Sequence, residues 1–260
     1  MALNEIVRMH EDLERALKKP TAERSWIMVI DIRKCVGDHS CAISCTAENV
    51  CPPGASYRHV FETEHKSFPD PDWFFMPANC QQCDNPPCML AANKIAQGAI
   101  IKRKDGIVVF HYPILIKNPK AGEAAGKACP YYAIVKDEGG FYTDRTPVFE
   151  PYETRDFYEY DKKLNRKRGN TKGTIRKCTF CLHRLESGML PACVSTCIGR
   201  AMYFGDRRDP QSLVSELLKK EQVWSLKADL KTLPRIYYIG YENRANIAAT
   251  SIISCMVCHK

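Results

Sequence analysis

The spacing of its cysteines constrains this chain more than any other feature of the sequence. Fourteen of the 260 residues are cysteine, far above ordinary usage in a chain long enough to build a core without disulfide bonds. They fall into the groups Cys35, Cys41, Cys45 and Cys51; Cys80, Cys83 and Cys88; Cys129; Cys178, Cys181, Cys193 and Cys197; and Cys255 with Cys258. Two-residue gaps, as in Cys80 to Cys83, place two thiolates on one tight turn where both can bind one metal centre. The sequence therefore predicts metal centres.

The first and last of the larger groups complement each other. Bacterial ferredoxins carry the run C-x2-C-x2-C-x3-C-P, in which the fourth cysteine ligates the other cluster of a pair. The group that begins at Cys35 fits this run with Asp38 in place of its second cysteine, and the group that begins at Cys178 fits it with a longer middle gap. Exchange of the fourth ligands predicts a first site on Cys35, Asp38, Cys41 and Cys197. It also predicts a second site on Cys45, Cys178, Cys181 and Cys193.

The middle groups retain all the ligands of one cluster and none of another. Ala92 stands where a fourth cysteine should follow Cys88, and the partner run keeps only its last member, Cys129. Exchange of the fourth ligands between these two runs still predicts a third site on Cys80, Cys83, Cys88 and Cys129. The sequence thus predicts three iron–sulfur clusters in a four-cluster frame, using 11 of the 14 cysteines and one aspartate.

Two alternatives stay open at this point. Carboxylate oxygen is a harder and weaker partner for iron than thiolate, so Asp38 either completes a [4Fe-4S] cluster or lies beside the open corner of a [3Fe-4S] cluster. Paired cysteines also suit zinc. The rival hypothesis is therefore a zinc-structured interaction or nucleic-acid-binding protein, although zinc does not explain why ligands are kept and lost in matched sets.

Other residues near cysteines carry weaker signals. Cys255, Cys258 and His259 form C-x-x-C-H, the attachment motif of c-type haem. The sequence leaves open whether this tail holds haem c or is unmodified. His39 and His183 lie beside predicted cluster ligands, and we expect both at the surface.

Further motifs carry a resemblance to a known family. They are Asp31-Ile-Arg-Lys-Cys35, Cys80-Gln-Gln-Cys83-Asp-Asn-Pro-Pro-Cys88, Lys104-Asp-Gly-Ile-Val-Val109, Cys129-Pro-Tyr, and Lys177-Cys178-Thr-Phe-Cys181 with Pro191-Ala-Cys193. Over residues 26–238 the chain resembles the iron–sulfur electron-transfer subunits of the DMSO reductase family of molybdopterin oxidoreductases. The absence of one cysteine run makes the chain similar to the three-cluster small subunit of pyrogallol–phloroglucinol transhydroxylase. That subunit has an extra C-terminal β domain, which this chain lacks.

The resemblance implies fold, role and partners together. It implies an α+β fold with two ferredoxin-like modules of short strands and cysteine loops. It also implies a non-catalytic subunit that relays electrons between a large molybdenum or tungsten pterin catalytic subunit and another redox partner. A membrane anchor and a cytochrome are the candidates for that second partner.

The groups and the patterns between them divide the chain. Residues 1–25 are expected to form an amphipathic helix, capped by Asn4 and ended by Pro20, that packs on its own chain or on a partner. The predicted parts are 26–71 with 175–208 as the first module, 72–140 as the second, 141–174 as a polar insertion that is solvated or faces another subunit, and 209–260 as a helix, strand and tail. Strands are expected at 26–30, 107–110 and 235–239.

Composition and charge limit the remaining classes. The longest apolar stretch, 247–257, is too short for a membrane span of about 20 residues. The net charge of +8 suits an acidic protein partner, and nucleic acid is not expected because the aromatics of the insertion precede its basic run. Residues 1–25 show no signal core or twin arginine. We therefore expect a cytoplasmic protein, or a periplasmic one exported with a signal-bearing partner.

Overall fold

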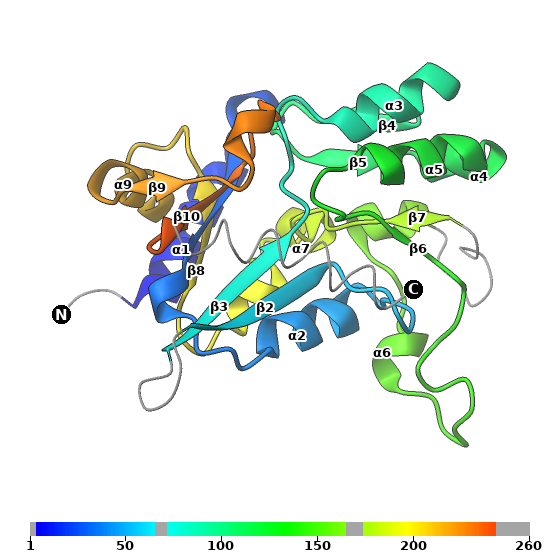
Figure 1. The fold of residues 1–260 in the computed structure, drawn as a ribbon, viewed down its shortest axis with the longest axis horizontal. Coiled ribbons are helices and arrows are strands. Elements are labelled where there is room, and N and C mark those ends of the chain that lie inside the picture. Colours follow the sequence, from blue (N-terminus) through cyan, green and yellow to red (C-terminus); the bar gives the residue numbers. More distant parts are fainter. Residues whose placement is uncertain (1–3, 66–71, 165–173, 243–260) are drawn as a thin grey trace.

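The computed structural model describes residues 4–65, 72–164 and 174–242, which form short helices and strands around one four-stranded sheet and three two-stranded sheets (Figure 1). The α-helices are α1 Glu5–Leu17, α2 Ser40–Glu48, α3 Pro87–Ile95, α4 Tyr112–Lys117, α5 Pro119–Ala128, α6 Pro151–Thr154, α7 Leu182–Glu186, α8 Ala192–Ser195 and α9 Leu213–Lys220. The 3-10 helices are η1 Thr21–Glu23, η2 Ile32–Lys34, η3 Glu159–Leu164 and η4 Ala228–Leu230. The strands are β1 Trp26–Asp31, β2 Arg58–His65, β3 Asp72–Asn79, β4 Ile100–Lys102, β5 Val108–Phe110, β6 Val135–Lys136, β7 Ile175–Arg176, β8 Met202–Asp206, β9 Val223–Trp224 and β10 Ile236–Ile239. This mixture confirms the predicted α+β class.

The main sheet has the strand order β8-β1-β10-β9. All six residues of β1 are buried, as is typical of a continuous apolar run covered on both faces. Met28 of β1 lies opposite Phe204 in the antiparallel β8 and opposite Ile236 in the parallel β10. Trp26, at the start of β1, stacks on Phe204. The strands expected near residues 26–30 and 235–239 are therefore found at the centre of this sheet.

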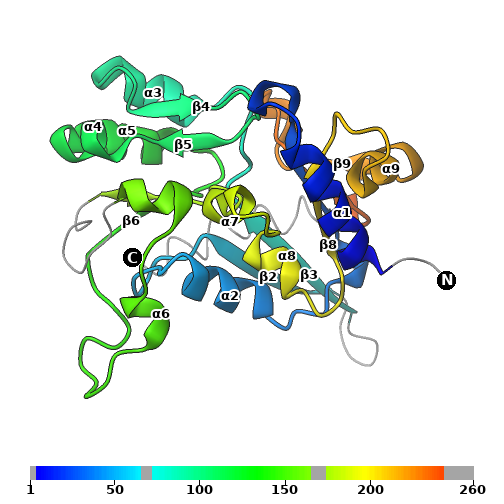
Figure 2. The same cartoon turned by 180° about the vertical axis from the view of Figure 1, so that it is seen from behind.

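Helix α1 packs on its own chain, beside β8 and α9 (Figure 2). Its expected cap is present, because the Asn4 side chain accepts a hydrogen bond from the Ile6 amide. The buried face of the helix includes Met9 and Leu13. On the same face, the Asp12 carboxylate accepts a hydrogen bond of 2.7 Å from the amide of Leu213, the first residue of α9. This contact joins the two helices, and the favourable position of an anion at a helix N-terminus adds to it.

Strands β2 and β3 form a hairpin that the sequence analysis did not predict. Its register runs from Arg58 opposite Asn79 to His65 opposite Asp72. The predicted boundary between residues 71 and 72 therefore separates two strands that pair with each other. The hairpin lies next to α2 (Figure 1), and its end at Arg58 and Asn79 reaches the cysteine groups described below.

A second, smaller core fills the region where the sequence lacks the ligands of a fourth cluster. Helix α3 packs closely on α5 there. Ala92, Ala121 and Ala125 are each 0% exposed, and Leu115 from α4 is also buried in this core. Small side chains let the two helices approach closely enough to pack at the density of an ordinary protein interior.

The polar insertion was expected to be solvated or to face another subunit; residues 144–151 are exposed, but the expectation is wrong for η3. Tyr160 and Asp161 of η3 are buried, and η3 lies against α7. His183 of α7 is 0% exposed, so its expected surface position is wrong as well. Its Nδ1 lies 3.2 Å from an Asp161 carboxylate oxygen, which ties the insertion to the cysteine loop that carries α7.

Glu48, at the end of α2, is the centre of this attachment. It accepts hydrogen bonds from Tyr158 and Arg184, contacts the Nε2 atom of His183 at 3.0 Å, and pairs with Arg155. Burial by itself would raise the pKa of Glu48, but the hydrogen bonds from His183 and Tyr158 and the positive charges of Arg155 and Arg184 lower it to about 2. One carboxylate thus holds the insertion, α2 and α7 together.

No helix in the described part of the chain combines the length and the apolar character that a membrane span requires.

We predict that Glu48→Gln lowers the free energy of unfolding by about 3 kcal/mol, because it leaves the partly buried Arg155 and Arg184 without their carboxylate. The wild-type contribution is complete above the ordinary pKa of 4.5 and is lost as the pH falls toward about 2. Urea unfolding of the cluster-loaded protein, followed by circular dichroism, measures the difference. Glu186→Gln is the control, because Glu186 is more exposed than Glu48 and lies 3.5 Å from Arg103, so this ion pair should contribute less than about 1 kcal/mol. Equal losses in the two variants would contradict the prediction.

Candidate metal centres

The cysteines of the described residues are thiols that lie in or beside short helices and loops, and ten of the twelve are buried. Cys41 and Cys45 lie four residues apart on α2, so they share one face of that helix. Phe180 and Cys181 both have left-handed backbone angles, φ 55° and 52°. This turn allows Cys178 and Cys181 to face the same space. Cys255, Cys258 and His259, the predicted haem motif, lie outside the described residues.

The structure brings together the three cysteines of the first site. Burial raises the pKa of Cys41 to about 12, and negative charge at Cys193 of the second site, and then at Cys35 and Cys197, raises it further. The Ala201 amide donates a hydrogen bond of 3.2 Å to the sulfur of Cys197. Asp38 is exposed on the loop between Cys35 and α2, yet its charge is close enough to contribute to a raised pKa of Cys35, after the larger effects of burial and Cys197.

The four cysteines of the second site also lie close together, and all four are buried. Burial raises the pKa of Cys45 and of Cys181 well above the ordinary value, and the neighbouring cysteines of this site raise both further. Cys51 lies beside Cys45, and its charge contributes to this shift. Thiolates crowded in this way repel one another in a low-dielectric interior unless a cation compensates them.

Side-chain N–H groups point at every sulfur of the second site. Asn49 donates to Cys45 at 3.5 Å and lies 3.9 Å from the sulfur of Cys181. In the β2–β3 hairpin, the Asn79 amide donates to Cys178 at 3.3 Å, and the Arg58 guanidinium donates to Cys193 at 3.4 Å. The Phe180 backbone amide also donates to Cys178, at 3.3 Å. Hydrogen bonds of this kind to cluster sulfurs are one of the means by which proteins set reduction potentials.

The residues predicted for the third site are Cys80, which follows β3, Cys83, Cys88 at the start of α3, and Cys129 after α5. Burial raises the pKa values of Cys83 and Cys88 to about 12, and the charge of Cys80 raises both further. Cys80 is also the cysteine whose charge most affects Cys178 of the second site. The second and third sites are therefore neighbours.

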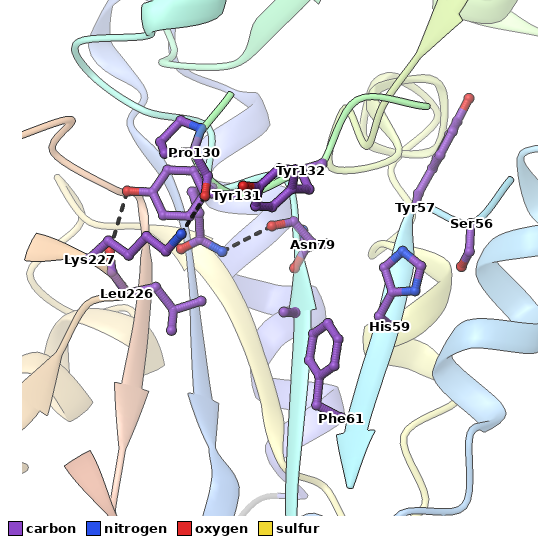
Figure 3. Close-up of a pocket in the computed structure, with 13 residues that line it drawn as sticks. Ser56, Tyr57, His59, Phe61, Asn79, Pro130, Tyr131, Tyr132, Leu226 and Lys227 are labelled. Atoms are coloured by element: carbon purple, nitrogen blue, oxygen red, sulfur yellow. Dashed lines mark hydrogen bonds between the residues drawn. The ribbon is translucent and has the colours of Figure 1, made fainter. Parts of the chain in front are cut away.

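A pocket opens beside the third site (Figure 3). It encloses about 540 Å³, including its open mouth. Asn79 and Gln81 flank Cys80 on one side, and Pro130, Tyr131 and Tyr132 follow Cys129 on the other. The Tyr131 hydroxyl donates to the Leu226 carbonyl at 3.2 Å, and the Lys227 amine donates to the Pro130 carbonyl at 2.6 Å.

The residues present fit iron–sulfur clusters. The donors are buried cysteine sulfurs in groups, each group contains thiolates that raise one another's pKa, and N–H groups are directed at the sulfurs. Within the described ranges, no three His, Cys, Asp or Glu side chains converge as closely as a single metal ion requires. The assignment of individual ligands remains a prediction at this point.

Sequence reasoning missed the side chains that serve the sulfurs. Arg58 lies in a strand that the sequence analysis did not predict. Asn49 and Asn79 lie near cysteines in the chain, but nothing in the spacing shows that Asn79 serves Cys178, about a hundred positions away. Only the fold brings these donors to their acceptors.

Comparisons with known proteins give the family. The model of the 4Fe-4S dicluster domain matches residues 71–149 and 151–207. The B subunit of the selenate reductase of Mesobacillus selenatarsenatis is 46% identical over 90% of this chain and 78% of the relative. The arsenate respiratory reductase iron-sulfur subunit of Shewanella sp. is 34% identical, over 82% and 94%. The B subunit of the tetrathionate reductase of Salmonella typhimurium is 33% identical, over 84% and 73%.

These matches confirm the predicted resemblance and the predicted iron–sulfur cofactors, and they do not favour the zinc-structured alternative. They also confirm that the fold is built on ferredoxin-like dicluster modules. The chain belongs to the 4Fe-4S dicluster family and is an iron–sulfur electron-transfer subunit of the molybdopterin oxidoreductase type.

Proposed function

We propose that the chain carries three iron–sulfur clusters on the first, second and third sites, in that order along one electron path. The observation that supports this most directly is the grouping of the buried cysteines, whose charges act on one another within each site. Arg58 lies between the first and second sites, and Cys80 and Cys178 connect the second with the third. Iron–sulfur clusters supply one-electron steps, and the buried donors hold the sulfurs in place.

The division into two modules belongs to this proposal. The first and second sites would occupy the module of residues 26–71 with 175–208, and the third the module of residues 72–140. The β2–β3 hairpin would be shared, because its end supplies donors to the second site and leads directly into Cys80. The fully buried alanines of α3 and α5 support three clusters rather than four, since their packing leaves the fourth position apolar.

Replacement of one third-site ligand should remove one cluster of three. We expect Cys129→Ser to lose about one third of the iron and acid-labile sulfide, because the remaining two sites keep their full cysteine sets. Cys51→Ser is the matched control, since Cys51 is an equally buried cysteine outside the predicted ligands, and it should keep all the iron. An unchanged iron content in Cys129→Ser would contradict the third site.

The same samples resolve the role of Asp38. Electron paramagnetic resonance of the oxidised protein shows a [3Fe-4S] signal if Asp38 only borders the first site. That signal is absent, and all three clusters are [4Fe-4S], if its carboxylate binds iron.

We infer further that the partner at the first site is a large molybdenum or tungsten pterin catalytic subunit, and that the complex is a reductase. The names of the three relatives, all reductase subunits, support this direction of electron flow. Val36, Ile43 and Ile198 flank the cysteines of the first site and are 59%, 68% and 71% exposed. Permanent subunit contacts are more apolar than transient ones, which favours this face for the large subunit. The pocket beside the third site would then face the second redox partner, for which a membrane anchor and a cytochrome are the candidates.

A double variant tests this interface. We expect Ile43→Glu with Ile198→Glu to abolish co-purification with the large subunit while the iron content stays unchanged, because the charges must be buried against an apolar face. Leu90→Glu on α3 is the control, because Leu90 is 60% exposed and α3 lies far from α2 (Figure 1). If the double variant still retains the large subunit, this face is removed from the proposal.

Haem c on Cys255, Cys258 and His259 would place a further redox centre beyond the clusters. If the motif is occupied, the denatured chain made in cells that mature c-type cytochromes stains for haem peroxidase, because thioether bonds survive denaturation. Cys255→Ala with Cys258→Ala should abolish the stain. An unstained wild-type band shows that the tail is unmodified.

A further inference from the structure

Arg58, the first residue of β2, is a cation buried without an anionic side-chain partner. Its side chain is among the largest that are fully buried. Within residues 4–65, 72–164 and 174–242, no carboxylate lies in ion-pair range of its guanidinium, and Nε and Nη1 have no hydrogen-bond partner. The remaining nitrogen, Nη2, lies 3.4 Å from the sulfur of Cys193 and 3.2 Å from the sulfur of Met28.

The negative charge around Arg58 comes from cysteine sulfurs of two different sites. In decreasing order, Cys193, Cys41, Cys178 and Cys45 attract its guanidinium. Cys41 belongs to the first site and the other three to the second. An unpaired buried cation is strongly unfavourable, so the position of Arg58 requires a stable anion on these sulfurs. A cluster with thiolate ligands is such an anion.

Arg176 shows what an ordinary buried arginine of this fold looks like. It is as deeply buried as Arg58. Its guanidinium pairs with Asp137 at 3.1 Å, donates to the Tyr57 hydroxyl, and donates to the backbone carbonyls of Val50 and Asn49. Arg176 thus has a carboxylate partner, and the cysteine that acts on it, Cys51, is outside the predicted ligand sets, whereas the charge of Arg58 is directed at predicted ligands.

We propose that Arg58 is the shared counter-charge of the first and second sites and that it raises the reduction potentials of both clusters. Reduction adds an electron to a buried anion, and a fixed cation nearby stabilises the added charge. The effect is greater at the second site, to which Arg58 donates a hydrogen bond. The effect is smallest at the third site, since the largest charges that act on Cys83, Cys88 and Cys129 come from residues other than Arg58. This inference rests on the proposed ligand sets.

The hairpin explains how one residue serves two sites. Arg58 and Asn79 are paired at the open end of β2 and β3, and their side chains donate to Cys193 and Cys178. Asn79 supplies a neutral donor to one sulfur of the second site, that of Cys178, and also donates to the backbone carbonyl of Cys80. Arg58 supplies a charge, whose influence extends further than a hydrogen bond and so includes Cys41.

Redox titration monitored by electron paramagnetic resonance tests the proposal on the cluster-loaded full chain. The signals are assigned by comparison with Cys129→Ser, which lacks the third cluster. In Arg58→Met, we expect the equilibrium constant for one-electron reduction to fall at least tenfold at the second site, equivalent to about 59 mV. We expect a smaller fall at the first site and no change at the third.

Three further variants separate charge from packing. Arg58→Gln keeps an N–H donor without the charge and should behave like Arg58→Met. Arg58→Lys keeps the charge and should restore most of both potentials. Arg176→Met also removes a buried cation, and we expect it to lower stability while leaving all three potentials close to wild type.

The possible results are distinct. Three wild-type potentials in Arg58→Met, or an equal shift of all three clusters, would overturn the proposal. The Met and Gln variants could also lose the first and second clusters and keep the third. In that case, retention of all three clusters by Arg58→Lys supports the proposal, and loss of the first and second clusters in Arg58→Lys overturns it. Fewer than three clusters in the wild-type chain would refute the ligand sets, and hence the proposed function, before Arg58 is considered.

Discussion

The repulsion between buried thiolates is the constraint on which this structure depends. Cysteine sulfurs in groups of three or four, removed from water, raise one another's pKa in each of the three sites. A fold can tolerate this only if positive charge and N–H donors are supplied at the same points. The short strands and helices meet that requirement: their ends bring Asn49 to Cys181, Asn79 to Cys178 and Arg58 to Cys193, sulfurs that come from other parts of the chain.

The same constraint explains why some buried charged side chains have a carboxylate partner and others do not. Around the second site, a buried arginine without a carboxylate is compatible with a stable fold because the sulfurs are its partners. Arg176, by contrast, is equally buried but forms an ion pair with Asp137. Glu48 joins the two environments, because it ends the helix that carries Cys41 and Cys45 and also anchors the insertion through Arg155 and Tyr158.

Sequence reasoning was most informative where spacing alone carries the chemistry. Cys80, Cys83, Cys88 and Cys129 were grouped from a ferredoxin template, and the fold places the same cysteines as neighbours. The central strands of the main sheet and the cap of α1 followed from apolar runs and from Asn4. Local patterns of this kind depend on a few consecutive residues, and for that reason they are visible in the sequence.

Contacts between distant segments could not be predicted in this way. His183 is polar and stands beside a cysteine, so a surface position was expected, yet Asp161 from the insertion covers it. The β2–β3 hairpin contains charged residues and Pro77, which weaken the signal of a strand. The roles of Arg58 and Asn79 depend on that hairpin, and they became visible only with the fold.

The packing of α3 on α5 limits how this chain could gain a further redox centre. Ala92, Ala121 and Ala125 are completely enclosed, and α5 is a continuous helix from Pro119 to Ala128. A cysteine at Ala92 would place one thiol in this apolar core, while the segment expected to supply the other ligands is folded as α4 and α5. Adding a fourth centre would require α5 to unwind before any new ligand was useful, and each intermediate would have lost its packing without yet holding iron. A further centre is therefore hard to gain by single substitutions.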